Sequence, residues 1–262
     1  MMDAARLERL SGAIFDALTA RTTIPPLTTT DPAITIDESY RISLELLQRR
    51  LNNNQRVVGK KIGVTSRVVM DMLGVHQPDF GFLTDAMQVS DNAVVRIAET
   101  LIQPRAEGEI AFRLKKDLKG PGVDNAAVID ATLSVHPCFE IVDSRIADWK
   151  IRIEDTVADN ASCGLFVIGE GAADPRDFDF ETCGAVVWKN DEIISTGAGA
   201  AALGSPVSAV AWLANTLGHY GVSLNAGDII LSGSLVPLEP ARAGDRFRLK
   251  IAGLGEVAIS FA

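Results

Sequence analysis

The chain has 262 residues, of which 47% are hydrophobic, and 25 basic against 34 acidic residues give it a net charge of -9. This size and composition predict a globular protein with a sizeable core. The acidic balance, with no basic cluster beyond short lysine pairs, argues against a nucleic-acid partner. No window approaches the ~20 apolar residues of a membrane span, so we expect no membrane association and a cytoplasmic location.

Cysteine and histidine are too few for several kinds of site. Cys138, Cys163 and Cys183 are far apart and odd in number, which favours reduced, mostly buried thiols over disulfides. The three histidines form no paired arrangement. Both observations argue against most zinc sites and Ser-His-Asp triads.

The first 56 residues predict a small helical unit. Leucine and isoleucine at helical spacing predict a helix over roughly the first twenty residues, and a Thr- and Pro-rich loop follows over 22–32. Thr35 and Glu38 have the form of a capping box before a second amphipathic helix over 36–51. We therefore expect residues 1–56 to pack as a helical N-terminal unit on a core of residues 57–262, in one structural domain overall.

The next segment, 57–65, predicts a strand with two different faces. Lys60 lies on the face of Ile62, whereas Lys61 lies on the face of Gly63 and Thr65. The small residues beside Lys61 leave space for a ligand. This alternation favours Lys61 over Lys60 as a site residue.

The remaining pattern is rich in strands. It predicts a short helix over 66–72, a turn at 77–81, strands near 94–114 and 133–142, a helix around 125–132, a hairpin over 182–196, a helix over 205–218, and strands at 228–232, 246–251 and 256–261. Because the strands cluster instead of alternating regularly with helices, we expect the α+β class with a mixed, curved sheet.

Three glutamates form the strongest chemical signal. Glu107 and Glu109 lie two residues apart in an apolar run, so they share one face of a strand, and Glu140 lies in a second apolar run. Buried carboxylates at this density require pairing, protonation or a cation. Hard oxygen ligands favour Mg²⁺ or Mn²⁺ over zinc. An edge strand with a solvated acidic face is the alternative interpretation.

Several runs, in order along the chain, resemble one family. They are 59–66 (GKKIGVTS), 77–81 (QPDFG), 106–112 (AEGEIAF), 140–145 (EIVDSR) and 158–162 (ADNAS). They resemble the 2-hydroxypenta-2,4-dienoate hydratases (2-keto-4-pentenoate hydratases) of bacterial aromatic meta-cleavage pathways and the related 4-oxalocrotonate decarboxylases, both in the fumarylacetoacetase-like superfamily. The run 226–234 (AGDIILSGS) is similar to a strand-and-loop signature of that superfamily. The resemblance extends from about residue 35 to the C-terminus.

The resemblance implies a fold, a site and an assembly. The fold would be a fumarylacetoacetase-like mixed β-roll or barrel with flanking helices, with 57–262 as the catalytic domain. The family's metal ligands match Glu107, Glu109 and Glu140, holding Mg²⁺ or Mn²⁺, and its active-site lysine and aspartate match Lys61 and Asp79. Members are homo-oligomers, pentamers and decamers among them, and the hydratases associate with 4-oxalocrotonate decarboxylase.

The implied reaction is addition of water to 2-hydroxypenta-2,4-dienoate or a close homologue. The dienol is ketonised by protonation at C5, and water then adds at C4 to give a 4-hydroxy-2-oxo acid. Asp79 is the candidate proton carrier, and Lys61 the candidate group that binds the carboxylate or favours the enolate. Ser162, Ser232 and Ser234 are candidate substrate-binding donors, with a role as turn residues as the alternative.

Other activities and roles remain to be tested. The main alternative is 4-oxalocrotonate (2-oxohex-3-enedioate) decarboxylation at the same metal site, which needs a cation for a second carboxylate. Hydrolysis of an acylpyruvate and a non-catalytic partner subunit are less favoured. We also expect Asp143 and Arg145 to form an ion pair near Glu140, and Trp149 to be a core or subunit-contact residue.

Overall fold

The N-terminal helices of the computed structural model agree with the sequence pattern. The structure describes residues 2–262, apart from the side chains of Val68, Met72 and Leu73. Helix α1 (Ala4–Ala20) begins after Asp3, and α3 (Ile36–Asn52) begins with the predicted capping box of Thr35 and Glu38. The predicted loop between them differs in containing a short helix, α2 (Leu27–Thr30).

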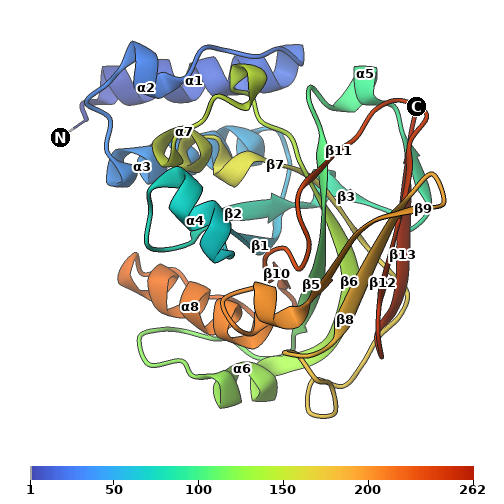
Figure 1. Cartoon of the computed structure of the whole chain (residues 1–262). Helices are drawn as coiled ribbons and strands as arrows, with labels where there is room; N and C mark the ends of the chain where they lie inside the picture. The colour runs from blue at the N-terminus through green and yellow to red at the C-terminus, as the bar shows by residue number, and fades with distance from the viewer. Residues whose placement is uncertain (1) are drawn as a thin grey trace.

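These helices cover one end of the molecule, together with α7 (Ile153–Ala158), which the sequence pattern did not predict (Figure 1). Ile14 and Ile42, from α1 and α3, join Ala158 of α7 in one buried apolar cluster. The buried Asp155 carboxylate accepts hydrogen bonds from the backbone N–H and the hydroxyl of Thr28. Apolar packing and these buried hydrogen bonds thus hold the N-terminal helices against the rest of the fold.

The larger of two sheets has eight strands in the order β2-β1-β10-β5-β6-β7-β3, with β11 paired to β5. The strands are β1 (Val57–Gly63), β2 (Asp79–Thr84), β3 (Gln88–Val89), β5 (Arg105–Leu114), β6 (Thr132–Val142), β7 (Cys163–Ile168), β10 (Ile229–Leu231) and β11 (Glu239–Pro240). Strands β1 and β10 are parallel, whereas β5 runs antiparallel to both β6 and β10. This mixed pairing confirms the predicted α+β class.

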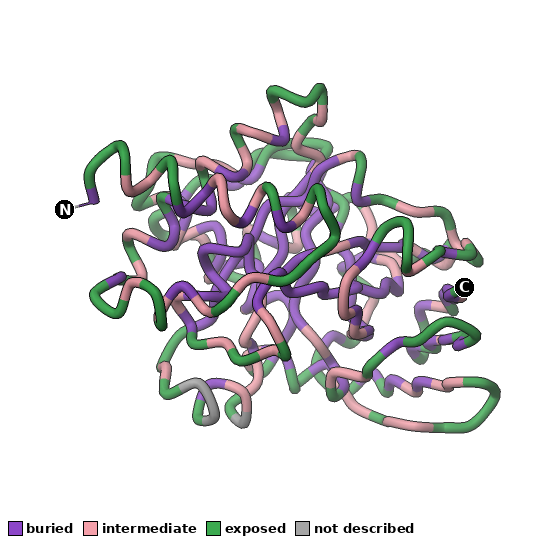
Figure 2. Tube along the Cα trace, turned by 90° about the horizontal axis from the view of Figure 1, so that it is seen from above, coloured by how far each residue is buried: buried purple, intermediate pink, exposed green. Residues whose placement is uncertain are grey.

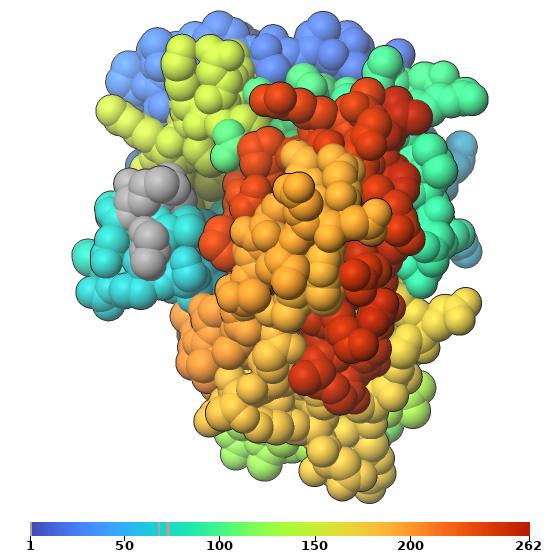
Figure 3. Space-filling view, turned by 45° about the vertical axis from the view of Figure 1, so that its right-hand side comes forward, coloured from blue at the N-terminus to red at the C-terminus, as the bar shows by residue number. Residues whose placement is uncertain are grey.

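The second sheet has five strands in the order β4-β13-β12-β8-β9. They are β4 (Ala93–Val95), β8 (Gly184–Lys189), β9 (Glu192–Ala198), β12 (Arg246–Ile251) and β13 (Gly255–Phe261). The predicted hairpin is β8–β9, and Asn190 and Asp191 at its turn both have positive φ, as a two-residue hairpin turn requires. In Figure 3 the orange and red segments of this sheet form the forward face of the molecule.

The core lies between the two sheets. Phe139 of the larger sheet packs edge-on against Phe247 of the smaller one, and Phe247 packs edge-on against Phe261. The buried part of the trace runs through the middle of the molecule, with exposed turns around it (Figure 2). The two sheets therefore curl around the main apolar core, which gives the mixed β-roll that the sequence predicts.

Helices α8 (Pro206–His219) and α6 (Asn125–Ala131) lie side by side at the opposite end from α1 (Figure 1). The run Gly199–His219 is apolar and long enough to meet the length and composition of a membrane span, which the sequence analysis did not anticipate. Its most apolar window is 56% buried inside the fold. Val210 and Leu213 on this helix are fully buried in the main core.

Two predicted boundaries were wrong. The strand expected near 94–114 is divided by the short helix α5 (Ile97–Thr100), and the turn expected at 77–81 contains the start of β2 at Asp79. Strand β7 was missed because its buried run, Leu165 to Val167, shows no alternation that would mark a strand. Helix α4 (Arg67–Leu73), capped by Ser66, lies where it was predicted.

Candidate active site

Two neighbouring strands bring three glutamates together. Glu107 on β5 is the direct register partner of Glu140 on β6, and Glu109 follows two residues along the same face of β5. Oxygen atoms from the three carboxylates lie within 4.8 Å of one another. Glu109 and Glu140 are fully buried. The acidic group therefore lies inside the fold and not on a solvated edge strand.

Burial and mutual repulsion disfavour the charged forms of all three carboxylates. Burial and the nearby Glu140 raise the pKa of Glu107 to about 7. Burial, Glu140 and Glu107 raise the pKa of Glu109 well above its usual value. The pKa of Glu140 is also raised by burial, although Lys61 partly opposes this effect. A bound cation would relieve this repulsion.

Two carboxylate oxygens, Oε1 of Glu109 and Oε2 of Glu140, have no hydrogen-bond donor within the described part of the chain. The other oxygen of Glu140, Oε1, lies 3.2 Å from the Lys61 ammonium as an ion pair. Oε2 of Glu109 accepts a 2.8 Å hydrogen bond from the backbone N–H of Gly233, which orients that carboxylate. An all-oxygen donor set with free lone pairs fits a hard divalent cation such as Mg²⁺ or Mn²⁺.

The two adjacent lysines have different partners. Lys60 Nζ lies 2.5 Å from Asp228 Oδ2, whereas Lys61 Nζ lies 3.2 Å from Glu140 Oε1. Burial alone would lower the pKa of Lys61, but Glu140 and Asp79 outweigh it and raise that pKa. The structure thus brings Lys61, and not Lys60, to the glutamates.

Asp79 is buried at the start of β2, beside Lys61. Burial raises the pKa of its carboxyl group, and the Lys61 charge opposes the shift. Its Oδ1 has no hydrogen-bond donor among the residues that the structure describes. A Cβ on Gly63 would collide with Asp79 Oδ1 and lie 3.0 Å from Lys61 Nζ. Because Gly63 has no side chain, the Lys61 ammonium and the Asp79 carboxylate can occupy the space beside it.

The three candidate serines are in different environments. Ser162 is buried, lines a cavity with Lys61 and Glu107, and has positive φ. The Ser234 hydroxyl donates to the carbonyl of Val236, so it is already used in a turn. Ser232 is buried, and its hydroxyl has no hydrogen-bond partner within residues 2–262.

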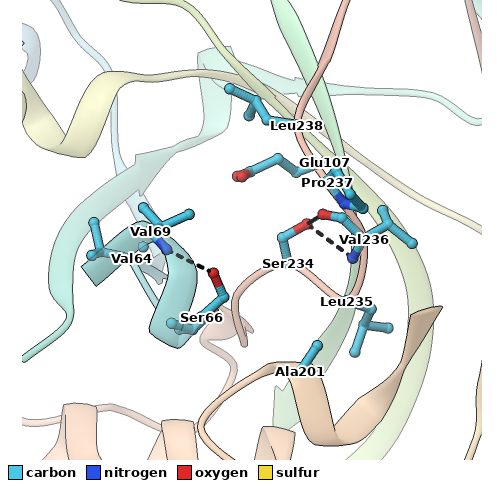
Figure 4. Close-up of a pocket in the computed structure, with 12 residues that line it drawn as sticks. Val64, Ser66, Val69, Glu107, Ala201, Ser234, Leu235, Val236, Pro237 and Leu238 are labelled. Carbon is cyan, nitrogen blue, oxygen red and sulfur yellow. Dashed lines mark hydrogen bonds between the residues drawn. The ribbon is translucent and has the colours of Figure 1, made fainter. Parts of the chain in front are cut away.

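Two cavities meet at Glu107. The apolar cavity, of about 370 Å³, is lined mainly by Val69, Ala201, Leu235, Val236, Pro237 and Leu238. The second cavity, of about 420 Å³, is also lined largely by apolar side chains, among them Val142, Trp149 and Ile151. It differs in adding the polar and charged side chains of Lys61, Asp79, Arg105, Thr156 and Ser162, and we call it the polar cavity. Figure 4 shows the Glu107 carboxylate pointing into the space between Val69 and the segment from Ser234 to Leu238. A ligand at the glutamates can thus extend into a polar or an apolar space.

The expected ion pair of Asp143 with Arg145 was wrong. Arg145 pairs instead with Asp159, at 2.5 Å between Nε and Oδ1, and it donates to the backbone carbonyl of Asp143. The Asp143 carboxylate accepts from the backbone N–H groups of Ile102 and Gln103. The turn that follows β6 brings the backbone of Asp143, and not its carboxylate, to the guanidinium.

Sequence reasoning missed two residues of the polar cavity, Arg105 and Trp149. The sequence predicts Trp149 as a core or subunit-contact residue, whereas in the structure it lines the cavity. For Arg105 a signal was available, because it lies two residues before Glu107 and so shares that strand face. For Trp149 there was none, because the short 3₁₀ turn that carries it has no periodic pattern.

Comparison with known proteins identifies the family. The family model described as the C-terminal part of fumarylacetoacetate (FAA) hydrolase matches residues 53–261. The chain therefore belongs to the fumarylacetoacetate hydrolase family, which confirms the resemblance and the fold inferred from its motifs. The match begins after α3, so it leaves most of the N-terminal helical segment outside.

Relatives in this family have specific names. The chain is 55% identical over 262 residues to a 2-hydroxyhexa-2,4-dienoate hydratase of Comamonas testosteroni, covering 100% of this chain and 99% of the relative. It is 61% identical over 222 residues to a 2-hydroxypent-2,4-dienoate hydratase of Pseudomonas putida, covering 85% and 100%. Among solved structures, 4-oxalocrotonate decarboxylase from Pseudomonas putida G7, complexed with magnesium and adipate, matches with a TM-score of 0.97 at 35% identity, covering 100% and 99%.

Proposed function

We propose that the chain is a metal-dependent hydro-lyase that adds water to 2-hydroxypenta-2,4-dienoate or a close homologue in aromatic meta-cleavage catabolism. Full-length relatives named as hydratases of these dienoates support the reaction class. The observation that carries the proposal is the convergence of three glutamates, two of them fully buried, beside Lys61 and Asp79, at the junction of a polar and an apolar cavity.

The glutamates would hold the metal ion. Glu107, Glu109 and Glu140 offer only oxygen atoms, two of them without donors among the described residues, which suits Mg²⁺ or Mn²⁺. The related decarboxylase was solved with magnesium and with calcium, which supports a hard divalent ion. When bound, such an ion supplies positive charge that stabilises an enolate oxygen beside a carboxylate.

Lys61 and Asp79 would handle the charge and the proton of the dienol. The enol O–H loses its proton while C5 gains one, and water then adds its oxygen to C4 and a proton to C3. Asp79 would carry a proton to C5, and its Oδ1, which accepts no hydrogen bond from residues 2–262, supports this role. The Lys61 ammonium favours the charged enolate and limits the rise in the Asp79 pKa.

A substrate tail that lies in the apolar cavity favours hydration over decarboxylation. A dienoate has an uncharged tail, whereas 4-oxalocrotonate has a second carboxylate that an apolar cavity would desolvate without compensation. Decarboxylation remains the second candidate, because the decarboxylase structure matches the whole chain with a TM-score of 0.97.

One assay separates the two reactions. 2-Hydroxypenta-2,4-dienoate is generated in situ, and the loss of its ultraviolet absorbance is followed with Mg²⁺ or Mn²⁺. The same protein is then given 2-oxohex-3-enedioate while CO₂ is measured. We expect turnover of the dienoate without CO₂ release. Turnover of the dicarboxylate alone, with CO₂ release, would contradict the hydratase proposal.

We further propose a cytoplasmic homo-oligomer, with a pentamer or decamer and a complex with 4-oxalocrotonate decarboxylase as the forms to test. All three cysteines are free thiols, which supports a reducing compartment. Mass photometry of the purified chain, alone and mixed with the decarboxylase, tests the assembly. A monomer at micromolar concentration would contradict it.

A further inference from the structure

Arg105 lies at the edge of the candidate site. It is the first residue of β5, two residues before Glu107, and it lines the polar cavity with Glu107 and Lys61. Strand geometry places side chains at this spacing on the same face, with backbone positions about 7 Å apart. The guanidinium is therefore within reach of a ligand that Glu107 helps to hold.

The Arg105 guanidinium stacks on an indole ring that hydrogen bonds hold in place. It stacks over the Trp149 ring, with its central carbon 4.5 Å from the ring centroid. The indole Nε1–H donates to the carbonyl of Gln103 at 3.1 Å, and the Gln103 side chain donates to the carbonyl of Ile146 at 2.6 Å. Asp148 and Trp149 both have left-handed backbone conformations, which non-glycine residues adopt at a cost. The local fold thus fixes the orientation of the indole under Arg105.

The charge of Arg105 has no internal partner. Three buried cations near the site each pair with a carboxylate: Lys60 with Asp228, Lys61 with Glu140, and Arg145 with Asp159. Within residues 2–262, by contrast, Arg105 forms no ion pair and no side-chain hydrogen bond. Burial lowers its pKa, and no carboxylate offsets that effect. A stacked guanidinium with free edge N–H groups is a receptor for a carboxylate.

We propose that Arg105 binds the C1 carboxylate of the 2-oxo acid substrate, so that the rest of the substrate points toward the apolar cavity. This assignment rests on the proposed function. The short spacing from Glu107 selects the carboxylate next to the C2 oxygen over a carboxylate at the far end of the chain. Arg105 lines the cavity while it is stacked on the Trp149 ring, and a guanidinium edge can make a bidentate contact with a carboxylate.

The test compares Arg105→Met and Arg105→Lys with Arg113→Met, an exposed arginine on the same strand. Calorimetric titration with pyruvate in the presence of Mg²⁺ measures binding of a C1 carboxylate without turnover. We expect Arg105→Met to weaken pyruvate binding roughly 10- to 100-fold, the effect of losing a hydrogen-bonded charge pair. Arg105→Lys should recover part of the affinity, and Arg113→Met should leave it unchanged.

Kinetics supply the second readout. With the dienoate, Arg105→Met should raise KM by the same factor and change kcat far less. Unchanged pyruvate affinity in Arg105→Met, or no pyruvate binding by the unmodified protein, overturns the assignment. Adipate, a dicarboxylate, is titrated in the same way. If Arg105→Met loses adipate binding but keeps pyruvate binding, the assignment is also overturned, because Arg105 would then bind a distal carboxylate. If pyruvate binds through Arg105 but no dienoate is hydrated, the proposed function fails while the carboxylate site stands.

Discussion

Two buried ionic groups in this molecule lie at similar depth but differ in how far their polar atoms are satisfied. Arg145 and Asp159 are both fully buried, and the guanidinium donates to Asp159 Oδ1 at 2.5 Å, to the carbonyl of Asp159 at 2.6 Å and to the carbonyl of Cys163 at 3.2 Å. The three glutamates of β5 and β6 instead share a single ion pair, from Lys61 to Glu140, and two of their oxygens, Glu109 Oε1 and Glu140 Oε2, have no donor among the residues described. The polar atoms of Arg145 and Asp159 find their partners within the protein, whereas the glutamates need a bound ligand, such as a cation, to satisfy their free oxygens.

This difference distinguishes an ion pair that stabilises the fold from a cluster of charges that binds a ligand. A satisfied buried pair stabilises the local turn, and removal of one partner leaves a buried charge. An unsatisfied cluster of like charges costs stability in the free protein, so it indicates a site that a ligand completes. The comparison predicts opposite outcomes for substitutions in the two groups.

The largest effect on stability is expected at Arg145. Arg145→Met leaves Asp159 buried without its partner, so we expect the free energy of unfolding to fall by about 3–5 kcal/mol. Urea denaturation followed by circular dichroism measures the change, with the exposed Arg113→Met as the matched control. A loss below about 1 kcal/mol would show that the pair is dispensable.

Glu109→Gln should lower activity without lowering stability, the opposite of what we expect for Arg145→Met. It removes one proposed metal ligand and one like charge, so we expect dienoate turnover to fall roughly 100- to 1000-fold, the equivalent of about 3–4 kcal/mol of transition-state stabilisation. The chelator-treated variant should be at least as stable as the unmodified protein. Glu256→Gln, at an exposed salt bridge with Lys250, is the control. Full activity in Glu109→Gln would exclude that carboxylate from the site.

Metal addition should stabilise the protein through the glutamates alone. At a concentration about 100 times its Kd, Mg²⁺ should raise the free energy of unfolding by about 2.7 kcal/mol. Thermal melts with and without chelator measure this increase. The same increase in Glu109→Gln would place the binding elsewhere.

The smallest effect is on pH dependence. The pKa of Glu107 is raised to about 7 in the metal-free fold, above the ordinary value that it recovers on unfolding. The folded protein therefore binds more protons than the unfolded chain between about pH 4.5 and 7, and this glutamate lowers stability as pH rises through that window. Because the metal binds the ionised carboxylate, the stabilisation by Mg²⁺ should be larger at pH 8 than at pH 6. Melts at both values test this, and an equal gain would contradict it.

The sequence predicted the site better than it predicted some of its surroundings. Strand alternation was enough to separate Lys61 from Lys60 and to place Glu107 and Glu109 on one face. It could not place Glu140 opposite Glu107, because register depends on the pairing of two strands. The predicted ion-pair partner of Arg145 was also wrong. Its true partner, Asp159, follows the end of α7, a short helix whose sequence pattern is too weak to predict.

The most direct test of the metal site is the stoichiometry of Mn²⁺ binding, measured by calorimetry and by electron paramagnetic resonance on the intact chain. If the three glutamates hold the ion, the unmodified protein binds one ion per chain, and the folded variant that combines Glu107→Gln, Glu109→Gln and Glu140→Gln binds none. Binding of one ion per chain by that folded triple variant, or none by the unmodified protein, would contradict it.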